Sequence, residues 1–504
     1  MRRWWVRVLT VVAVVALLLL GAAYLLTNAN WGREQIRRRL VAFIENNSHG
    51  RVQIGEVTGN LLKGFTLHDV VITDSARAPF VKADEIWARY NLSTLLGKRI
   101  DLYEVRLVHP IIVLDKQPGG KWNYDRIFPG DTTTRTGTKQ TGWRTWIRFS
   151  NVTLLDGDVT VRTPWEPDVH ITGAERDDAV RRALGPSGRL KLLKVPNGYQ
   201  KESSFHRINA LLPLLRLEDP GYKNRLVDVA ALKMIAEPFR PPIADVRGLT
   251  GIFEFTGDSL WWQGARVTLP RTRLSGDGRY YVNSGDLHLR LHGDPVQPGD
   301  LRWAVPNLPE KGSGKLDFAM HWTGAQSVYE ARNMDVDLAG SKVKGQIEVT
   351  VTDTLAYRDA NLRFSSVDTR LLEKLFQIGR LPREGFLAGR AAFNGGQHSL
   401  RVDADVTFDE RRSGRSRIAA VGVLGLDKGV FNARDLRVRL LPLQMALATA
   451  ASPSLPLRGT LTGTATLNGS TGSQMLAVGD ITHVDRGAVS HATGRATFRM
   501  KGPT

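Results

Sequence analysis

The 504-residue chain contains no cysteine. This absence excludes disulfide bonds, thiolate metal sites and cysteine nucleophiles, but a disulfide-free protein can work in either a reducing or an oxidising compartment. Common catalytic motifs are missing too, since the sequence holds no GxSxG, HExxH or EF-hand run. Residues 312–315 (Gly-Ser-Gly-Lys) fall short of a phosphate-binding loop, because Pro309 stands where its first glycine would be.

The titratable residues form no catalytic or metal-binding set. His288 and His292 belong to an alternating strand, where they share a face about 13 Å apart, which is too far for one ion. Asp403 and Asp405 stand about 7 Å apart on the polar face of another such strand, a spacing that suits solvation as well as a glycosidase pair. We therefore expect no enzyme activity, no cofactor, no metal site and no small-molecule substrate.

Acidic residues are fewer than basic ones: the chain has 50 Asp and Glu against 69 Lys and Arg, for a net charge of +19. Such a balance points to nucleic acid or an anionic membrane when the charge is clustered. Here the basic residues are spread along the chain, without a basic face interleaved with aromatics. We interpret the charge as a solvated surface and expect no nucleic-acid partner.

The long apolar run lies at the N-terminus, over residues 8–26. As a helix its nineteen residues rise about 28 Å, close to the hydrocarbon thickness of a bilayer. The run predicts an uncleaved transmembrane anchor that includes Val8, Leu17, Leu20 and Leu26. A cleaved signal peptide is the alternative, although no small-residue cleavage site is evident. Arginines flank both ends of the run, so the flanking charge does not set its orientation.

Residues 32–46 predict a short amphipathic helix, with Ile36, Leu40, Phe43 and Ile44 on one side. Such a helix can lie on a membrane surface or cap the fold that follows it. We favour capping.

Beyond residue 50 the hydrophobic period changes to two. Residues 287–292, 346–352, 401–408 and 436–440 alternate apolar side chains with charged or hydroxylated ones. Each of these strands therefore has one apolar and one polar face. Glycine-rich turns separate them, which is typical of an antiparallel sheet with one solvated face and not of βαβ winding.

An internal repeat organises these strands. A Leu-Pro-x-x-Gly motif recurs at residues 308–312, 381–385 and 455–459, at spacings of 73 and 74 residues. Residues 248–251 read as a degenerate earlier copy. Residues 371–378 predict a short helix just before one motif, so each repeat is expected to hold several strands and a helical or irregular crossover. Repeats of this length predict a solenoid-like sheet.

Residues 52–74, with glycines at 55, 59 and 64, follow a pattern of apolar positions that resembles the opening of the TamB and AsmA-like families. Residues 100–114 and the run Gly-Lys-Trp-Asn-Tyr at 120–124 add to this resemblance. It covers residues 1–128 and extends to the repeat region only in style. The matching positions include no catalytic residue.

The resemblance implies a single-pass inner-membrane protein with the bulk of the chain in the periplasm of a diderm bacterium. It also implies a mostly β fold, an elongated, curved and repetitive antiparallel groove (a β-taco or solenoid) behind an N-terminal transmembrane helix. Family members carry phospholipids between the two membranes or assist outer-membrane protein assembly with an Omp85-type partner. TamB-like chains are usually longer and end in a β-rich domain, so this chain reads as a truncated piece or a short relative.

The expected organisation has four parts. Residues 1–30 form a cytoplasmic tip and anchor, and residues 31–128 form the amphipathic helix with an N-terminal β module. Residues 129–142 form a flexible loop, and residues 143–504 form the repetitive groove, with the repeat starting near residue 289.

The apolar faces of the strands either close against each other as a sandwich core or line an open groove. The linear repeat favours the groove, because stacked units extend a sheet without closing it. The predicted lining consists of Phe318, Met320, Trp322, Ile347, Val349, Val351, Val402, Val406, Phe408, Val438 and Leu461. Phospholipid handling is the leading hypothesis. A scaffold for outer-membrane protein strands and a basic binder of lipopolysaccharide or other anionic glycans are the alternatives.

Overall fold

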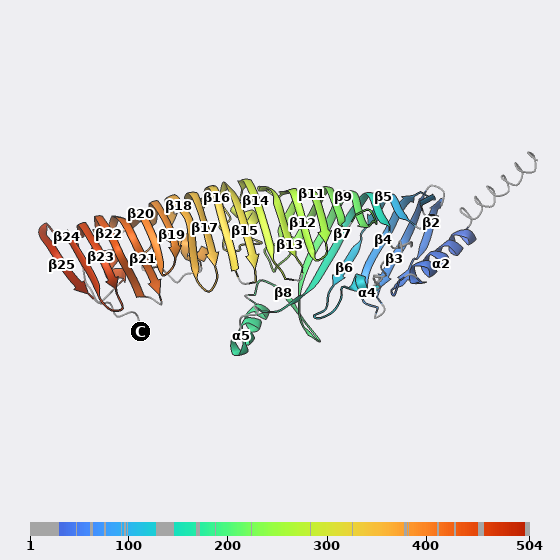
Figure 1. The fold of residues 1–504 in the computed structure, drawn as a ribbon. Helices are drawn as coiled ribbons and strands as arrows, with labels where there is room; N and C mark the ends of the chain where they lie inside the picture. The colour runs from blue at the N-terminus through green and yellow to red at the C-terminus, as the bar shows by residue number, and fades with distance from the viewer. Residues whose placement is uncertain are drawn as a thin grey trace, which may run out of the picture. The chain divides into compact units, whose positions relative to one another are not determined.

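A computed structural model describes residues 30–498. Gaps in this description fall at residues 47, 61–63, 75–76, 92, 95–96, 98, 128–145, 168–171, 187, 223, 283, 325, 377–380, 382, 411–412, 428–429 and 452–457. The chain is mostly β (Figure 1). It divides into two compact units, residues 1–270 and residues 271–504. The predicted boundaries at residues 128 and 143 lie inside the first unit.

The described part of the first unit contains a sheet and three helices. Its helices are α2 (Asn30–Asn46), α4 (Asn123–Ile127) and α5 (Gly173–Leu184). Its strands are β1 (Arg51–Gln53), β2 (Glu56–Asn60), β3 (Gly64–Thr73), β4 (Pro79–Tyr90), β5 (Ile100–Val108), β6 (Ile111–Asp115), β7 (Ile147–Trp165), β8 (Lys191–Val195), β9 (Gly198–Glu218), β10 (Arg225–Glu237), β11 (Ala244–Thr256) and β12 (Ser259–Thr268).

The sheet of the first unit is mixed, which corrects the expectation of a purely antiparallel sheet. Both β5 and β6 pair in parallel with β7, while β7 pairs with β9 in the antiparallel sense. A parallel pair needs a crossover connection of a dozen or more residues. Residues 116–146, which include α4, provide that length between β6 and β7.

Helix α2 packs onto the start of this sheet. Its Leu40, Val41 and Ile44 contact a buried cluster formed by Val52, Ile54, Val57, Leu67 and Val70. Arg37 adds a polar contact, since its Nη1 donates to the carbonyl oxygen of Ile54 at 3.0 Å. The prediction that this helix caps the fold that follows it is confirmed.

The predicted anchor, with Val8, Leu17, Leu20 and Leu26, lies outside the described residues. Within residues 30–498, as far as the structure describes them, no helix combines the length and the apolar character needed to cross a membrane.

The second unit is a meander in which each strand pairs antiparallel with the next. Its strands are β13 (Arg273–Tyr281), β14 (Leu287–Val296), β15 (Gly312–Thr323), β16 (Gln326–Leu338), β17 (Ser341–Val351), β18 (Leu355–Asp368), β19 (Phe386–Gly396), β20 (Ser399–Glu410), β21 (Gly414–Asp427), β22 (Val430–Gln444), β23 (Thr460–Ser470), β24 (Met475–Asp485) and β25 (Ala488–Phe498). Among its described residues, three short helical segments interrupt it: η1 (Pro298–Leu301), α6 (Thr369–Phe376) and α7 (Met445–Ala451).

The sequence repeat corresponds to four strands and one crossover. Segments η1, α6 and α7 follow β14, β18 and β22, so four strands separate each crossover from the next. The prediction of several strands plus a helical or irregular crossover is therefore confirmed, with the helical form observed. The Pro-containing copy at η1 and the Ala-rich copy at α7 are helical, as is the predicted segment over its described residues 371–376.

The repeated glycine stands where each crossover returns to the sheet. A Cβ on Gly312, Gly385 or Gly459 would lie 2.2 to 2.5 Å from a backbone carbonyl oxygen of the neighbouring part of the sheet. Two of these glycines also close the crossover, because the carbonyl of Gly385 accepts from the N–H of Thr369 at 3.1 Å, and that of Gly459 accepts from the N–H of Met445 at 2.9 Å. Glycine therefore recurs at this position of the repeat because the backbones pack too closely there for a side chain.

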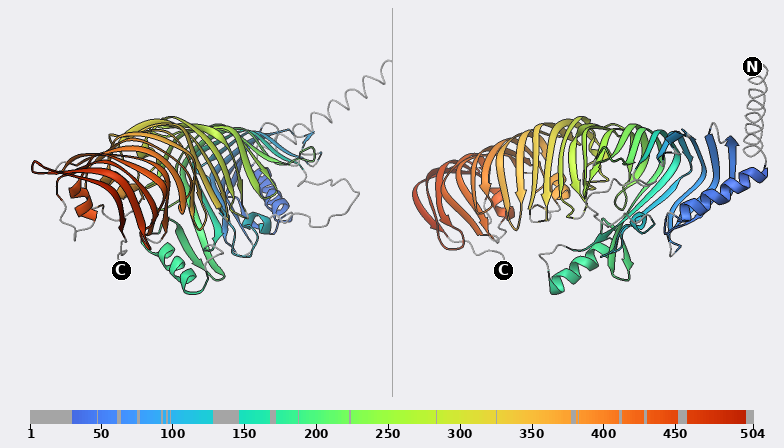
Figure 2. Two further views of the ribbon diagram at one scale, coloured as in Figure 1. Left: turned by 60° about the vertical axis from the view of Figure 1, so that its left-hand side comes forward. Right: turned by 45° about the vertical axis from the view of Figure 1, so that its right-hand side comes forward.

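The strands of the second unit bend in a common sense (Figure 2). Bulges contribute to the bend, with residues of positive φ such as Asp359 in β18 and Asp435 in β22 at interruptions of the register. Gly345 in β17 contributes as well, with a φ of 128° that L-residues rarely adopt. Bulges and glycine kinks are the usual means by which a sheet is curved.

Candidate functional site: an apolar face in the second unit

The strand register places the predicted lining residues on one face of the second unit. Met320 of β15 stands opposite Tyr329 of β16, which stands opposite Val349 of β17. Because side chains alternate along a strand, Phe318 and Trp322 share the face of Met320, and Ile347 and Val351 share the face of Val349. We call this side of the sheet the apolar face.

The same face continues through the later strands. Phe393 stands opposite Val402, and Leu387 stands opposite Phe408, so Val402, Val406 and Phe408 of β20 lie on the apolar face with them. Further along, Ala404, Ala420 and Val438 form a continuous register row. Leu461 of β23 stands opposite Leu443 of β22 on this face. All eleven predicted residues therefore occupy one surface, although they come from five strands.

Exposure differs between the two faces. The valines of the predicted lining are half-buried, whereas Val421 and Val478 of the opposite face are 46% and 41% exposed. Leu436 and Met475 are fully packed, in a cluster formed by neighbouring strands of the apolar face. Trp322, next to a hairpin turn, is 50% exposed. These values fit a face on the inner side of the bend, where neighbouring side chains converge.

No second sheet covers this face among the described residues of the second unit, which form a single bent layer (Figure 2). Most of the predicted lining side chains consequently have an intermediate exposure, between that of a sandwich core and that of an isolated surface residue. The described strands of this unit thus belong to one sheet and not to two sheets packed face to face.

A line of small residues crosses the middle of the apolar face. Consecutive strands from β19 to β24 contribute one residue each to this register row: Ala391, Ala404, Ala420, Val438, Ala465 and Gly479. Bulkier side chains flank it, with Phe393 and Val402 on one side and Val406 and Ile418 on the other. Sequence reasoning missed this row, because alanine adds little contrast to an alternating pattern and its members are far apart in the chain.

The opposite, polar face is laced by ion pairs. Arg417 donates two hydrogen bonds to the carboxylate of Asp405, at 2.8 and 2.7 Å, and holds the pKa of that carboxyl below its ordinary value. Arg390 lies 3.1 Å from Asp403. Asp403 and Asp405 are thus engaged with arginines, as expected for a solvated strand face.

The two histidines of β14 have separate partners. His288 faces His321 on β15, with ring centroids 3.9 Å apart. The pKa of His288 is lowered, mainly by burial and next by the charge of the neighbouring His321. His292 lies 2.6 Å from the carboxylate of Asp317. In the part of the chain that the structure describes, no group of three or more histidines and carboxylates is arranged to hold a metal ion.

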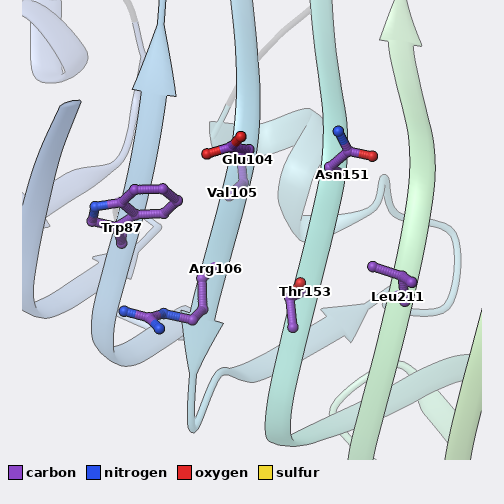
Figure 3. Close-up of a pocket in the computed structure, with 7 residues that line it drawn as sticks. All are labelled: Trp87, Glu104, Val105, Arg106, Asn151, Thr153 and Leu211. Atoms are coloured by element: carbon purple, nitrogen blue, oxygen red, sulfur yellow. The ribbon is translucent and has the colours of Figure 1, made fainter. Parts of the chain in front are cut away.

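The first unit has a shallow depression of about 430 Å³ on its own sheet, lined by Trp87, Glu104, Val105, Arg106, Asn151, Thr153 and Leu211 (Figure 3). Its charges are already engaged. Arg106 lies 3.4 Å from Glu85 with its guanidinium 5.8 Å from the ring of Trp87, and Glu104 accepts from Arg89 at 2.8 Å. Both of its charged lining residues are therefore paired within the sheet.

Compared with known proteins, the chain matches no family model, no curated protein and no solved structure.

Proposed function

We propose that the apolar face of the second unit holds the acyl chains of phospholipids and carries them along the sheet. The observation behind this proposal is an uncovered apolar surface that runs without interruption across many antiparallel strands. From β14 to β24 it spans ten strand-to-strand steps, or roughly 48 Å at about 4.8 Å per step. A single acyl layer is about 15 Å thick, half of a bilayer core of about 30 Å.

The energetic basis is the hydrophobic effect. Each exposed CH₂ group costs about 0.8 kcal/mol in water, so a lipid that crosses an aqueous space alone meets a large barrier. A continuous apolar path lowers that barrier at every position, and half-buried side chains leave room for a chain to replace water. Such handling needs no catalytic group, cofactor or metal.

The proposal includes a location. The apolar run at residues 8–26 would anchor the chain in the inner membrane, with both units in the periplasm of a diderm cell. We also propose that the apolar face forms a groove along which lipids move between the two membranes. Any contact with an Omp85-type outer-membrane protein is likewise proposed.

A photo-crosslinking experiment on the full chain tests the lipid proposal. The crosslinker is placed at Val349 or Val402 on the apolar face, and at the adjacent Glu348 or Asp403 on the polar face. Mass spectrometry of the products then identifies the crosslinked molecules. We expect phospholipid adducts from the valine positions and few from the acidic positions.

Equal lipid labelling at both kinds of position would rule the proposal out. Adducts between Val349 and newly made outer-membrane proteins, in place of lipid, would instead identify the chain as a scaffold for their strands. The paired positions differ by one residue, so differences in expression or local mobility are matched.

A further inference from the structure

The polar face of the second unit contains a depression of about 410 Å³ that is lined by Asn394, Ser399, Arg401, Val423 and Arg434. Four of these residues form one register row. Asn394 of β19 stands opposite Arg401 of β20, Arg401 opposite Val423 of β21, and Val423 opposite Arg434 of β22. The two arginines therefore flank Val423 from either side.

Two glycines stand in the next row toward the hairpins. Gly396 stands opposite Ser399, and Gly425 stands opposite Asn432, on the same polar face. Gly425 is fixed as glycine, since a Cβ there would lie 2.2 Å from the carbonyl oxygen of His398. Gly396 and Gly425 therefore place no side chain beside the depression, and Arg401 and Arg434 line it.

The arginines of the depression lack the acidic partners that other arginines of this face have. Arg390 pairs with Asp403, Arg417 pairs with Asp405 and Arg358 pairs with Glu348. With the residues that the structure describes, Arg401 and Arg434 form no ion pair, and no carboxylate lines the depression. This is the reverse of the first unit's depression, where the charged residues are paired.

The donors that surround the hollow suit a ligand with several negatively charged oxygens. Arg401 and Arg434 are two strands apart, about 10 Å between backbones, so their flexible guanidiniums can reach a common group above Val423. Each offers up to five N–H donors, and the Asn394 amide and the Ser399 hydroxyl add neutral ones. A carboxylate is satisfied by one bidentate arginine, whereas a phosphate has oxygens and charge for two.

We propose that this depression binds a phosphate group, carried either by a lipid headgroup or by a soluble phosphate ester. The site lies on the face opposite the apolar one, so it does not depend on the lipid path proposed above. Its contacts are charge-assisted hydrogen bonds from Arg401 and Arg434, with Asn394 and Ser399 orienting the group.

Binding to the full chain is measured with two probes. Inorganic phosphate is titrated by calorimetry, and vesicles of phosphatidylcholine with added phosphatidylglycerol are tested by co-sedimentation. The double substitution Arg401→Gln with Arg434→Gln is compared with Arg290→Gln with Arg363→Gln. The control removes the same charge from exposed positions of the polar face outside the depression. Thermal unfolding checks that both proteins fold like the unsubstituted chain.

We expect the first double variant to weaken binding of at least one probe tenfold or more, and the control to change it less than twofold. Loss for both probes assigns the site to the phosphate group itself, and loss for vesicles alone assigns it to a lipid headgroup. Equal losses of binding in the two double variants would show that only the overall positive charge matters, and would overturn the proposal. Unchanged binding in the first variant, or no binding of either probe by the unsubstituted chain, would overturn it as well.

Discussion

Gly459 lies directly beneath the backbone of Val484, so close that a Cβ on the glycine would be 2.2 Å from the Val484 carbonyl oxygen. Gly459 also has a φ of 81°, in the region that favours glycine. The relation recurs in the other copies of the repeat, at Gly312 with Asp337 and at Gly385 with Asp409. The repeated glycine therefore marks the place where two backbones must approach each other.

Replacing this glycine should destabilise the second unit. We expect Gly459→Val to lower the free energy of unfolding by about 2 kcal/mol or more, through steric overlap with the Val484 carbonyl and an unfavourable φ. Gly324→Ala is the matched control, because nothing lies within 4 Å of its Cβ position. Urea unfolding measures both proteins. Equal stability of the two variants would show that the sheet relaxes around the added side chain.

A charge on the apolar face should reduce lipid binding without unfolding the protein. We expect Val349→Asp to lower co-purified phospholipid at least severalfold, since a carboxylate among acyl chains is strongly unfavourable. Val349 is half-buried and so leaves room for solvation of the new group. Thr350→Asp adds the same charge to the neighbouring residue on the polar face, opposite Val328. Lipid extraction and mass spectrometry quantify both. An identical loss in the two variants would contradict the assignment of the faces.

The Asp405–Arg417 pair should make stability depend on pH in the acidic range. The folded-state pKa of Asp405 is below its ordinary value of 3.8, so its stabilising contribution is present above about pH 4 and is lost as the pH falls through the folded-state pKa. We expect Asp405→Asn to destabilise by about 0.5–1 kcal/mol at pH 7. Near pH 2 the substitution should cost less. Urea unfolding at both pH values measures the difference, and an equal cost at the two would argue that the carboxylate charge is not involved.

The apolar run at residues 8–26 should control membrane association. We expect Leu17→Arg combined with Leu20→Arg to shift the chain from the carbonate-resistant membrane fraction to the soluble fraction. The reason is that each arginine at the centre of a span costs about 2.5–3.5 kcal/mol on insertion scales. Leu17→Ala combined with Leu20→Ala is the control and should remain in the membrane. Full retention of the arginine variant would remove the anchor from the proposal.

Part of the architecture follows from local pattern. The alternation in residues 401–408 is enough to place Val402, Val406 and Phe408 on one side of a strand, because the side-chain period of a strand is two. The apolar segment at residues 371–378 predicts a helix close to the observed α6, and the glycine motif marks the start of β15, β19 and β23. Helix α2 and its docking side are recoverable in the same way.

Other features depend on which strand meets which. The parallel pairing of β5 and β6 with β7 was not predictable, because the partner is chosen across the connection that contains α4. The row of small residues from Ala391 to Gly479 and the depression between Arg401 and Arg434 combine residues far apart in the chain. No short window of sequence contains such a row.

The sequence by itself determined the strands, the repeat and the polarity of the two faces, since these depend on backbone geometry and side-chain alternation within a few residues. Only the tertiary structure decided that the lining residues of five strands share one face of the sheet, and that two arginines 33 positions apart flank Val423 without acidic partners among the described residues. The physical reason is register. A slip of one residue between neighbouring strands would reverse every side chain of the displaced strand, and it is the set of turns, bulges and close glycine contacts that selects one alignment.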